Sequence, residues 1–256
     1  MKSFVLHNIG GKKVMMHYYP ASVKLSPAAV IIFSGGGYSH RAYHEGEPYA
    51  LLLNEMGVDA FLVDYRVNPD LFPAPLIDAR RAVAHVRNHC EEYAVDPERI
   101  AVMGSSAGGH LAELVSTYKE RIDEDDTAPV ICIPNAQILC YPVTDIYSHR
   151  GSYEMLLGGD VRLHERVTPT LLADENTPPA FIWHTSTDDC VDIKGTYRYV
   201  TRLSELGVLC EMHVYPIGCH GLGLATGDQK RAPVEYVQRW VEDLERWLKL
   251  IGWISE

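Results

Sequence analysis

Residues 99–111 constrain the fold more than any other stretch of the chain. A strand-like apolar run leads into a serine between two glycines, and a helical pattern begins directly afterwards. Gly104 and Gly108 flank Ser106 as G-x-S-x-G, and they remove the side chains that would clash where strand and helix meet at a sharp turn. A bare motif of this kind arises by chance in many proteins. Here its flanks predict the strand and the helix that it requires.

Short apolar runs alternate with helical patterns along the rest of the sequence. This alternation predicts an α/β fold with a mostly parallel, doubly wound sheet and helices on both faces. Core strands are expected at residues 28–33, 60–63, 100–103, 138–141, 180–184 and 211–215. Residues 4–19 are expected to add one or two antiparallel edge strands. Helices are expected at residues 75–93, 192–206 and 233–251. In the first helix, Arg80, Arg81 and Arg87 are expected to face water.

The size and composition of the chain favour one large domain. Its 256 residues are 46% hydrophobic and 22% charged, which suits a single α/β domain over residues 1–256. Residues 145–179 are polar, contain glycines and show weak periodicity. They are therefore expected to form an insertion or cap segment over the sheet, rather than a core element, and to shape substrate access.

The charge and the N-terminal sequence narrow the choice of partners and location. A net charge of -11 and a pI of about 5.5 argue against binding to nucleic acid or anionic membranes. Residues 1–20 show no signal peptide, and no apolar stretch is long enough to span a membrane, so a cytoplasmic location is expected. The six cysteines lack C-x-x-C spacing, which is typical of reduced thiols. Whether the chain forms a homo-oligomer is left open.

Activation of Ser106 as a nucleophile requires a histidine and a carboxylate. In doubly wound hydrolases these follow the serine in the order acid, then histidine, and each lies beyond the end of a later strand. Asp188 follows the strand at 180–184 and is favoured because Asp-x-x-Val returns Val191 to the core. Its neighbour Asp189 is the rival, and both acids could instead cap the next helix. His220 lies in a glycine-flanked loop after the last strand, which favours it as the base.

A glycine run after the first core strand is a candidate oxyanion hole. The expected donors are the backbone amides of Gly36, Gly37 and Ala107. A dinucleotide-binding turn is the alternative, but G-x-G-x-x-G is absent because His40 stands at the third glycine position. The side chains just past the run could bind a sugar or could pack within the loop: Tyr38, His40, Tyr43 and His44.

Two histidines in the first predicted helix are a candidate metal-binding pair. His85 and His89 share one helix face at i, i+4, which is a spacing that can hold a metal. No third ligand is evident nearby, so they are interpreted as solvated helix residues and no metal site is expected.

Besides the serine motif, further short motifs that are typical of one protein family are spread over most of the chain. They are Gly35-Gly36-Gly37-Tyr38, Glu45-Gly46-Glu47-Pro48, Asp64-Tyr65-Arg66-Val67, Pro75-Leu76-x-Asp78-Ala79-x-Arg81-Ala82-Val83, Asp96-Pro97-x-Arg99-Ile100, Gly104-Ser105-Ser106-Ala107-Gly108-Gly109-His110-Leu111-Ala112, Trp183-His184-Thr185 and His220-Gly221-Leu222-Gly223-Leu224-Ala225. On these motifs the chain resembles the α/β-hydrolase esterases of the acetylxylan esterase-like group, near the feruloyl esterase-type group.

The resemblance implies a triad of Ser106, Asp188 and His220 that needs no metal or cofactor. It implies hydrolysis of short acyl esters, such as acetyl groups on sugars or xylo-oligosaccharides, through an acyl-serine. Two positions depart from the family pattern: Ser34 stands where His or Pro is common, and Asp192 replaces the proline that often follows Val191. Two alternatives stay open at this point, namely a serine peptidase of the same fold and a non-catalytic binding module on a hydrolase scaffold.

Overall fold

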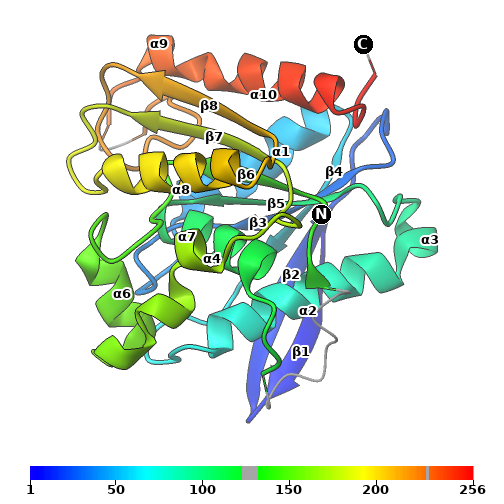
Figure 1. The fold of residues 1–256 in the computed structure, drawn as a ribbon. Coiled ribbons are helices and arrows are strands. Elements are labelled where there is room, and N and C mark those ends of the chain that lie inside the picture. Colours follow the sequence, from blue (N-terminus) through cyan, green and yellow to red (C-terminus); the bar gives the residue numbers. More distant parts are fainter. Residues whose placement is uncertain (123–131, 229–230, 256) are drawn as a thin grey trace.

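Eight strands form one sheet in the computed structural model, which describes residues 1–122, 132–228 and 231–255 (Figure 1). In chain order the strands are β1 (Lys2–Ile9), β2 (Lys12–Tyr19), β3 (Ala29–Phe33), β4 (Asp59–Val63), β5 (Ile100–Ser105), β6 (Ala136–Cys140), β7 (Ala180–Thr185) and β8 (Cys210–Tyr215). Across the sheet they lie in the order β1-β2-β4-β3-β5-β6-β7-β8. The pairs β1–β2 and β2–β4 are antiparallel and the others are parallel, which confirms the predicted mostly parallel sheet and its antiparallel edge.

The strand order reverses beside β3 and β5. From β3 the chain moves to β4 on one side, whereas from β5 it moves through β6, β7 and β8 on the other. Open α/β sheets bind ligands at such a reversal, beyond the carboxyl ends of the strands. Phe33 lies opposite Gly104, and Ser105 lies opposite Cys140, so these strands end at a common edge. The loops that leave this edge can therefore bring residues that are distant in sequence together.

Helices cover both faces of the sheet (Figure 1). They are α1 (Glu47–Glu55), α2 (Ala74–Asn88), α3 (Cys90–Tyr93), α4 (Ser106–Thr117), α6 (Arg150–Leu157), α7 (Pro169–Leu172), α8 (Lys194–Glu205), α9 (Glu235–Gln238) and α10 (Trp240–Leu250), with 3-10 turns η1 (Tyr43–Glu45), η2 (Val161–Leu163) and η3 (Glu165–Val167). The apolar sides of α2, α4 and α8 pack on one face, and those of α1 and α10 pack on the other. Strands β3, β5, β6 and β7 are buried along their whole length, as expected of parallel strands covered on both sides.

Two of the three predicted helices are interrupted. The pattern over 75–93 is divided between α2 and α3 at His89, whose N–H is shared by the carbonyls of His85 and Val86. A shared bond of this kind tightens the last turn and ends the regular helix. The pattern over 233–251 is likewise divided between α9 and α10, whereas α8 agrees with the helix predicted at 192–206.

Arg80 does not face water, contrary to the expectation from helical periodicity. Its side chain is buried, and its guanidinium donates hydrogen bonds to the carbonyls of Tyr118 and Glu120. It also lies over the Tyr118 ring, 5.3 Å from the ring centroid. Helix α2 packs against α4, and the chain after α4 covers Arg80. The apolar periodicity of α2 alone cannot predict this contact.

The segment 145–179 lies between β6 and β7 and contributes more to the core than expected. It contains α6, η2, η3 and α7, and its side chains Tyr153, Leu156 and Val167 are buried in the same apolar cluster as α2 and α4. The interpretation of this segment as separate from the core was therefore wrong in part. A few large apolar side chains are enough to anchor it, although they are too sparse to produce a clear period.

Candidate active site

Ser106 occupies the junction between β5 and α4. The strand ends at Ser105 and the helix begins at Ser106, whose backbone has a φ of 53° in the left-handed region. A Cβ on Gly104 would lie 2.1 Å from the carbonyl oxygen of Gly108, and one on Gly108 would lie 2.0 Å from that of Phe33. Both positions therefore require glycine. The sharp turn presents the Ser106 hydroxyl at the carboxyl edge of the sheet.

His220 lies within hydrogen-bonding distance of Ser106. It belongs to the loop after β8, and its Nε2 is 2.8 Å from Ser106 Oγ. Its Nδ1 is 2.8 Å from Asp188 Oδ2. A carboxylate only accepts, so Nδ1 carries the hydrogen and Nε2 is left as the acceptor for the serine hydroxyl. This is the tautomer that a general base for Ser106 needs.

Asp188 and Asp189 both contact His220, but through different groups. Asp188 faces the imidazole, whereas Asp189 accepts a hydrogen bond from the backbone N–H of His220 at 3.0 Å. Asp188 Oδ1 accepts from the N–H groups of Cys190 and Val191 at 2.9 and 2.8 Å. Burial alone would raise the pKa of Asp188, but hydrogen bonds from His184 and His220 outweigh it and hold that pKa well below its usual value. Asp188 is therefore ionised at neutral pH.

Asp192, the carboxylate that departs from the family pattern, points elsewhere. Its side chain accepts from the N–H of Lys194, while its own backbone N–H donates to the carbonyl of Ser148. The third carboxylate of this loop is thus exposed and caps the start of α8.

The loop after β3, residues 34–38, lies beside the nucleophile and is named the oxyanion loop here. Within the described residues, no acceptor is bound to the backbone N–H of Gly36 or of Gly37. Ala107 lies in the first turn of α4, where helical N–H groups lack intrahelical partners. Beside Gly37, the Tyr38 hydroxyl is 2.7 Å from His110 Nδ1. Because burial lowers the pKa of His110 to about 4, this imidazole is neutral and accepts from Tyr38.

Residues 15–203 match the BD-FAE family. The chain belongs to the BD-FAE family. Together with the sheet described above and the relatives described below, this membership confirms the α/β-hydrolase fold and the resemblance to the acetylxylan esterase-like group.

Relatives of this BD-FAE chain include longer proteins. It is 30% identical over 261 residues to an acetylxylan esterase from Xylanibacter ruminicola, covering 98% of this chain and 51% of that protein. It is 31% identical over 209 residues to endo-1,4-beta-xylanase B from Butyrivibrio fibrisolvens, covering 78% of this chain and 33% of that protein. The chain therefore spans between a third and about half the length of these curated relatives.

A solved structure resembles the chain over nearly its whole length. The crystal structure of an acetyl ester-xyloside bifunctional hydrolase from Caldicellulosiruptor lactoaceticus has a TM-score of 0.86 and 37% sequence identity, covering 99% of this chain and 97% of that chain. The carboxylesterase Cest-2923 from Lactobacillus plantarum shares the fold, with a TM-score of 0.84 at 22% identity.

The four residues considered for sugar contacts occupy different environments in this BD-FAE chain. Tyr38 is buried and bound to His110, so the structure removes it from the candidates for direct substrate contact. His40 is exposed beside Gly36. Tyr43 is exposed and donates its hydroxyl hydrogen to Glu47. His44 donates from Nε2 to the carbonyl of Gly221, 2.9 Å away, in the loop that carries His220.

Two histidines near the triad were missed by the sequence reasoning. His184 is fully buried at the end of β7, and its Nε2 is 3.2 Å from Asp188 Oδ2, while its Nδ1 is 2.9 Å from Thr196 Oγ1. His149 accepts from the N–H of Ser152 at the start of α6, and burial together with the nearby His220 lowers its pKa. The sequence signals for His184 are its place in the Trp183-His184-Thr185 motif and its position four residues before Asp188. None was available for His149.

The described residues show no group of three or more His, Cys, Asp or Glu side chains that could hold a metal ion. His85 and His89 stack with ring centroids 4.2 Å apart, and His85 Nε2 contacts the Tyr93 hydroxyl.

Among the described residues, no helix is long and apolar enough to cross a membrane. The cytoplasmic location stays a prediction.

Proposed function

We propose that this chain is a serine carboxylesterase that removes short acyl groups, above all acetyl, from sugars or xylo-oligosaccharides through an acyl-serine intermediate. The main support for this proposal is the hydrogen-bonded triad Ser106–His220–Asp188, in which both hydrogen bonds are 2.8 Å long. The backbone N–H groups of Gly36 and Gly37 beside the serine, to which no acceptor is bound within the described residues, support it. So do the names of the relatives, an acetylxylan esterase and an acetyl ester-xyloside hydrolase.

Acylation begins when Ser106 Oγ attacks the ester carbonyl. His220 Nε2 takes the hydroxyl proton, and the ionised Asp188 stabilises the imidazolium that forms. The amides of Gly36, Gly37 and Ala107 would donate to the oxyanion of the tetrahedral intermediate, and each well-aimed donor contributes about 3 kcal/mol to the transition state. His220 then protonates the leaving alcohol, and the C–O bond breaks to give the acyl-serine.

Deacylation repeats the same sequence with water as the nucleophile. His220 removes a proton from water, the carbonyl carbon is attacked, and the Ser106 oxygen leaves with the proton from His220. The products are the carboxylic acid and the free enzyme.

The segment between β6 and β7 supports a short acyl group. Its described elements are an eight-residue helix, a four-residue helix and two 3-10 turns. Elements this short offer little continuous apolar surface to cover a fatty chain. The backbone N–H of Asp192 donates to the carbonyl of Ser148, which joins this segment to the loop that carries Asp188 and supports its role in access to Ser106.

The first experiment replaces the nucleophile. Ser106→Ala should fold normally and lose hydrolysis of p-nitrophenyl acetate by several orders of magnitude, because no other group can carry the acyl chain. Turnover near that of the natural chain would refute the assignment. A fluorophosphonate probe should label the natural chain at Ser106 and leave the variant unlabelled. Absence of any adduct on the natural chain would favour the binding-module alternative.

The second experiment defines the substrate. Rates on acetyl, butyryl and feruloyl esters and on acetylated xylo-oligosaccharides should be highest for the acetyl compounds. Faster cleavage of a peptide amide than of these esters would favour the peptidase alternative.

A further inference from the structure

A short 3-10 turn, η1, joins the two loops that surround the nucleophile. Its last residue, Glu45, is 2% exposed, which is unusual for a carboxylate. Oε2 of Glu45 accepts a hydrogen bond from the N–H of Gly35 at 3.0 Å, in the oxyanion loop. Oε1 accepts from the Tyr141 hydroxyl at 2.7 Å. None of the catalytic steps above uses this buried carboxylate.

Tyr141 extends the contact to the other side of the site. It follows β6 directly, and its ring meets the His220 ring edge-on, with centroids 5.1 Å apart. Its hydroxyl accepts the N–H of Gly223 at 2.8 Å, within residues 216–225, named the histidine loop here. A single carboxylate therefore connects the oxyanion loop to the histidine loop through one tyrosine.

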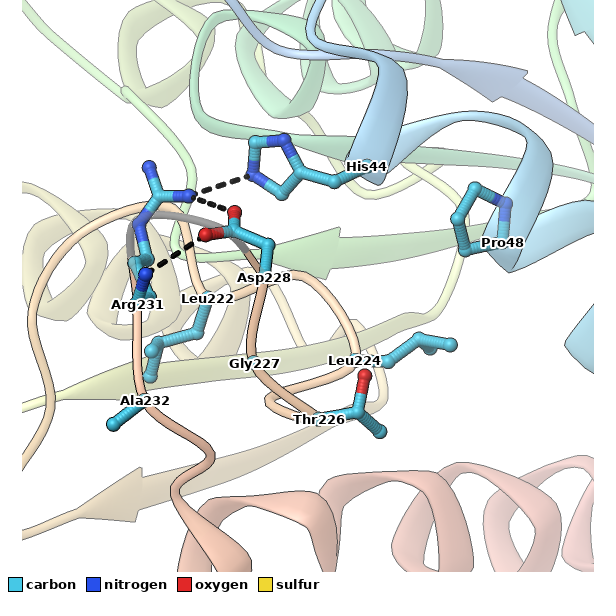
Figure 2. Close-up of a pocket in the computed structure, with 9 residues that line it drawn as sticks. All are labelled: His44, Pro48, Leu222, Leu224, Thr226, Gly227, Asp228, Arg231 and Ala232. Atoms are coloured by element: carbon cyan, nitrogen blue, oxygen red, sulfur yellow. Dashed lines mark hydrogen bonds and ion pairs between the residues drawn. The ribbon is translucent and has the colours of Figure 1, made fainter.

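The residue before Glu45 reaches the same histidine loop. His44 Nε2 donates to the carbonyl of Gly221, the residue that follows His220. Figure 2 shows His44 and Arg231 directed toward one another at the edge of a cavity of about 90 Å³, with Asp228 beside the guanidinium. The turn η1 thus binds the histidine loop directly at Gly221, through His44, and indirectly at Gly223, through Glu45 and Tyr141.

Gly35, which is bound to Glu45, also lies against the backbone next to the nucleophile. A Cβ on Gly35 would lie 2.2 Å from Glu45 Oε2, 2.8 Å from the carbonyl oxygen of Ser105 and 3.1 Å from Ser106 Cβ. The carboxylate, the oxyanion loop and the elbow are therefore packed without space between them. Any shift of Glu45 has to move Gly35, and with it the amides of Gly36 and Gly37 that follow.

We propose that Glu45 is a positioning residue that sets the distance between the oxyanion loop and the histidine loop, with Tyr141 as its link to the second loop. The inference rests on the proposed function of Ser106. Both loops lack helix or strand and contain several glycines, so their own conformational preferences hold them weakly. Catalysis requires both loops in place at once, and a misplacement of about 1 Å can cost about 100-fold in rate.

The test compares Glu45→Gln with Tyr141→Phe. Glutamine keeps the shape of glutamate but offers one oxygen to two donors, and phenylalanine removes the hydroxyl that Glu45 and Gly223 share. We expect each variant to lower kcat for p-nitrophenyl acetate by about 10–100-fold, with KM changed less than about twofold. Fluorophosphonate labelling of Ser106 should slow in parallel. The double variant should be little worse than the poorer single one, because both changes break one bridge.

The control is Glu47→Gln in the same region. Glu47 accepts from the hydroxyls of Tyr19 and Tyr43, and among the described residues no hydrogen bond joins its side chain to either loop, so its variant should label Ser106 at the natural rate. Thermal unfolding of all variants separates lost stability from lost rate. Natural kcat and labelling in Tyr141→Phe would overturn the inference, even if Glu45→Gln fails to fold. Failure of the proposed function differs, because the natural chain would then neither hydrolyse esters nor accept the probe.

Discussion

Two buried carboxylates in this molecule have opposite surroundings. Asp188, in the loop after β7, is contacted by His184 and His220 and by the N–H groups of Cys190 and Val191. Glu113, in the middle of α4, is fully buried, and neither of its oxygens has a hydrogen-bond partner among the described residues. The pKa of Asp188 is held well below its usual value, whereas burial raises the pKa of Glu113 well above its own.

The difference shows that donors, rather than burial, decide whether a buried carboxylate is charged. Desolvation favours the neutral acid at both sites. A loop has free N–H groups to offer a carboxylate, and β7 brings His184 to the same place. Inside a helix the N–H groups are already bonded to carbonyls four residues earlier, so Glu113 finds none. The negative charge of Asp145 raises the pKa of Glu113 further.

The largest effect is expected when Asp188 loses its charge. In Asp188→Asn the side-chain oxygen has to face the N–H groups of Cys190 and Val191, which leaves the amide NH2 toward His220. Nδ1 of His220 must then accept, so its hydrogen moves to Nε2 and the imidazole can no longer take the Ser106 proton. We expect kcat for p-nitrophenyl acetate to fall by about 10³–10⁴-fold with the fold intact.

Asp189→Asn is the matched control for that variant. The asparagine oxygen can still accept from the backbone N–H of His220, so the loss should be only a few-fold. A larger loss in Asp189→Asn than in Asp188→Asn would transfer the role of the acid to Asp189.

A smaller effect is expected when Asp188 keeps its charge but loses one donor. The donor in question is His184 Nε2. If glutamine replaces His184, its amide nitrogen lies about where the imidazole Nε2 lay, whereas the shorter asparagine does not reach that position. His184→Asn should therefore lower kcat/KM by about 10–100-fold, as the loss of an orienting partner commonly does, and His184→Gln should lose less. Equal rates in the two variants would show that the His184–Asp188 contact does not orient the acid.

The arrangement of the triad could be predicted because strand ends are visible in the sequence. Ser106, Asp188 and His220 each follow a predicted strand, and parallel strands bring their carboxyl ends to one edge of the sheet. The choice between Asp188 and Asp189 depends on the local turn, in which the N–H of Asp188 donates to the carbonyl of Thr185. This turn directs the Asp188 side chain toward the imidazole of His220 and the Asp189 side chain toward the backbone N–H of His220. The pattern of apolar residues cannot distinguish between two neighbouring residues in this way.

The residues that were missed depend on contacts between distant segments. Glu45 precedes a helix, where an acidic residue is ordinary, and its burial arises only when η1 packs against the loops after β3 and β8. Arg80 has the spacing of a surface residue until the chain after α4 covers it. His149 lies in a segment whose few apolar anchors gave no period. Glu45 reaches Tyr141 and Arg80 reaches Tyr118, both more than 20 positions away, so local periodicity could not reveal these contacts.

The last effect is expected at Glu113, and it concerns stability alone. The unfolded chain releases this proton above the ordinary pKa of 4.5, whereas the folded chain keeps it, so folding stability is fully present below that pH and declines as pH rises. The decline is about 1.4 kcal/mol per pH unit until the folded pKa is reached.

Glu113→Gln should abolish this decline, so the variant should gain stability over the natural chain as pH rises from 5 to 8, at unchanged kcat. Urea unfolding at each pH measures the gain, with the exposed Glu55→Gln as control. Parallel stability curves for Glu113→Gln and the natural chain would mean that Glu113 is ionised in the folded state. The contrast with Asp188 would then fail, because burial without donors would have left a charge in place.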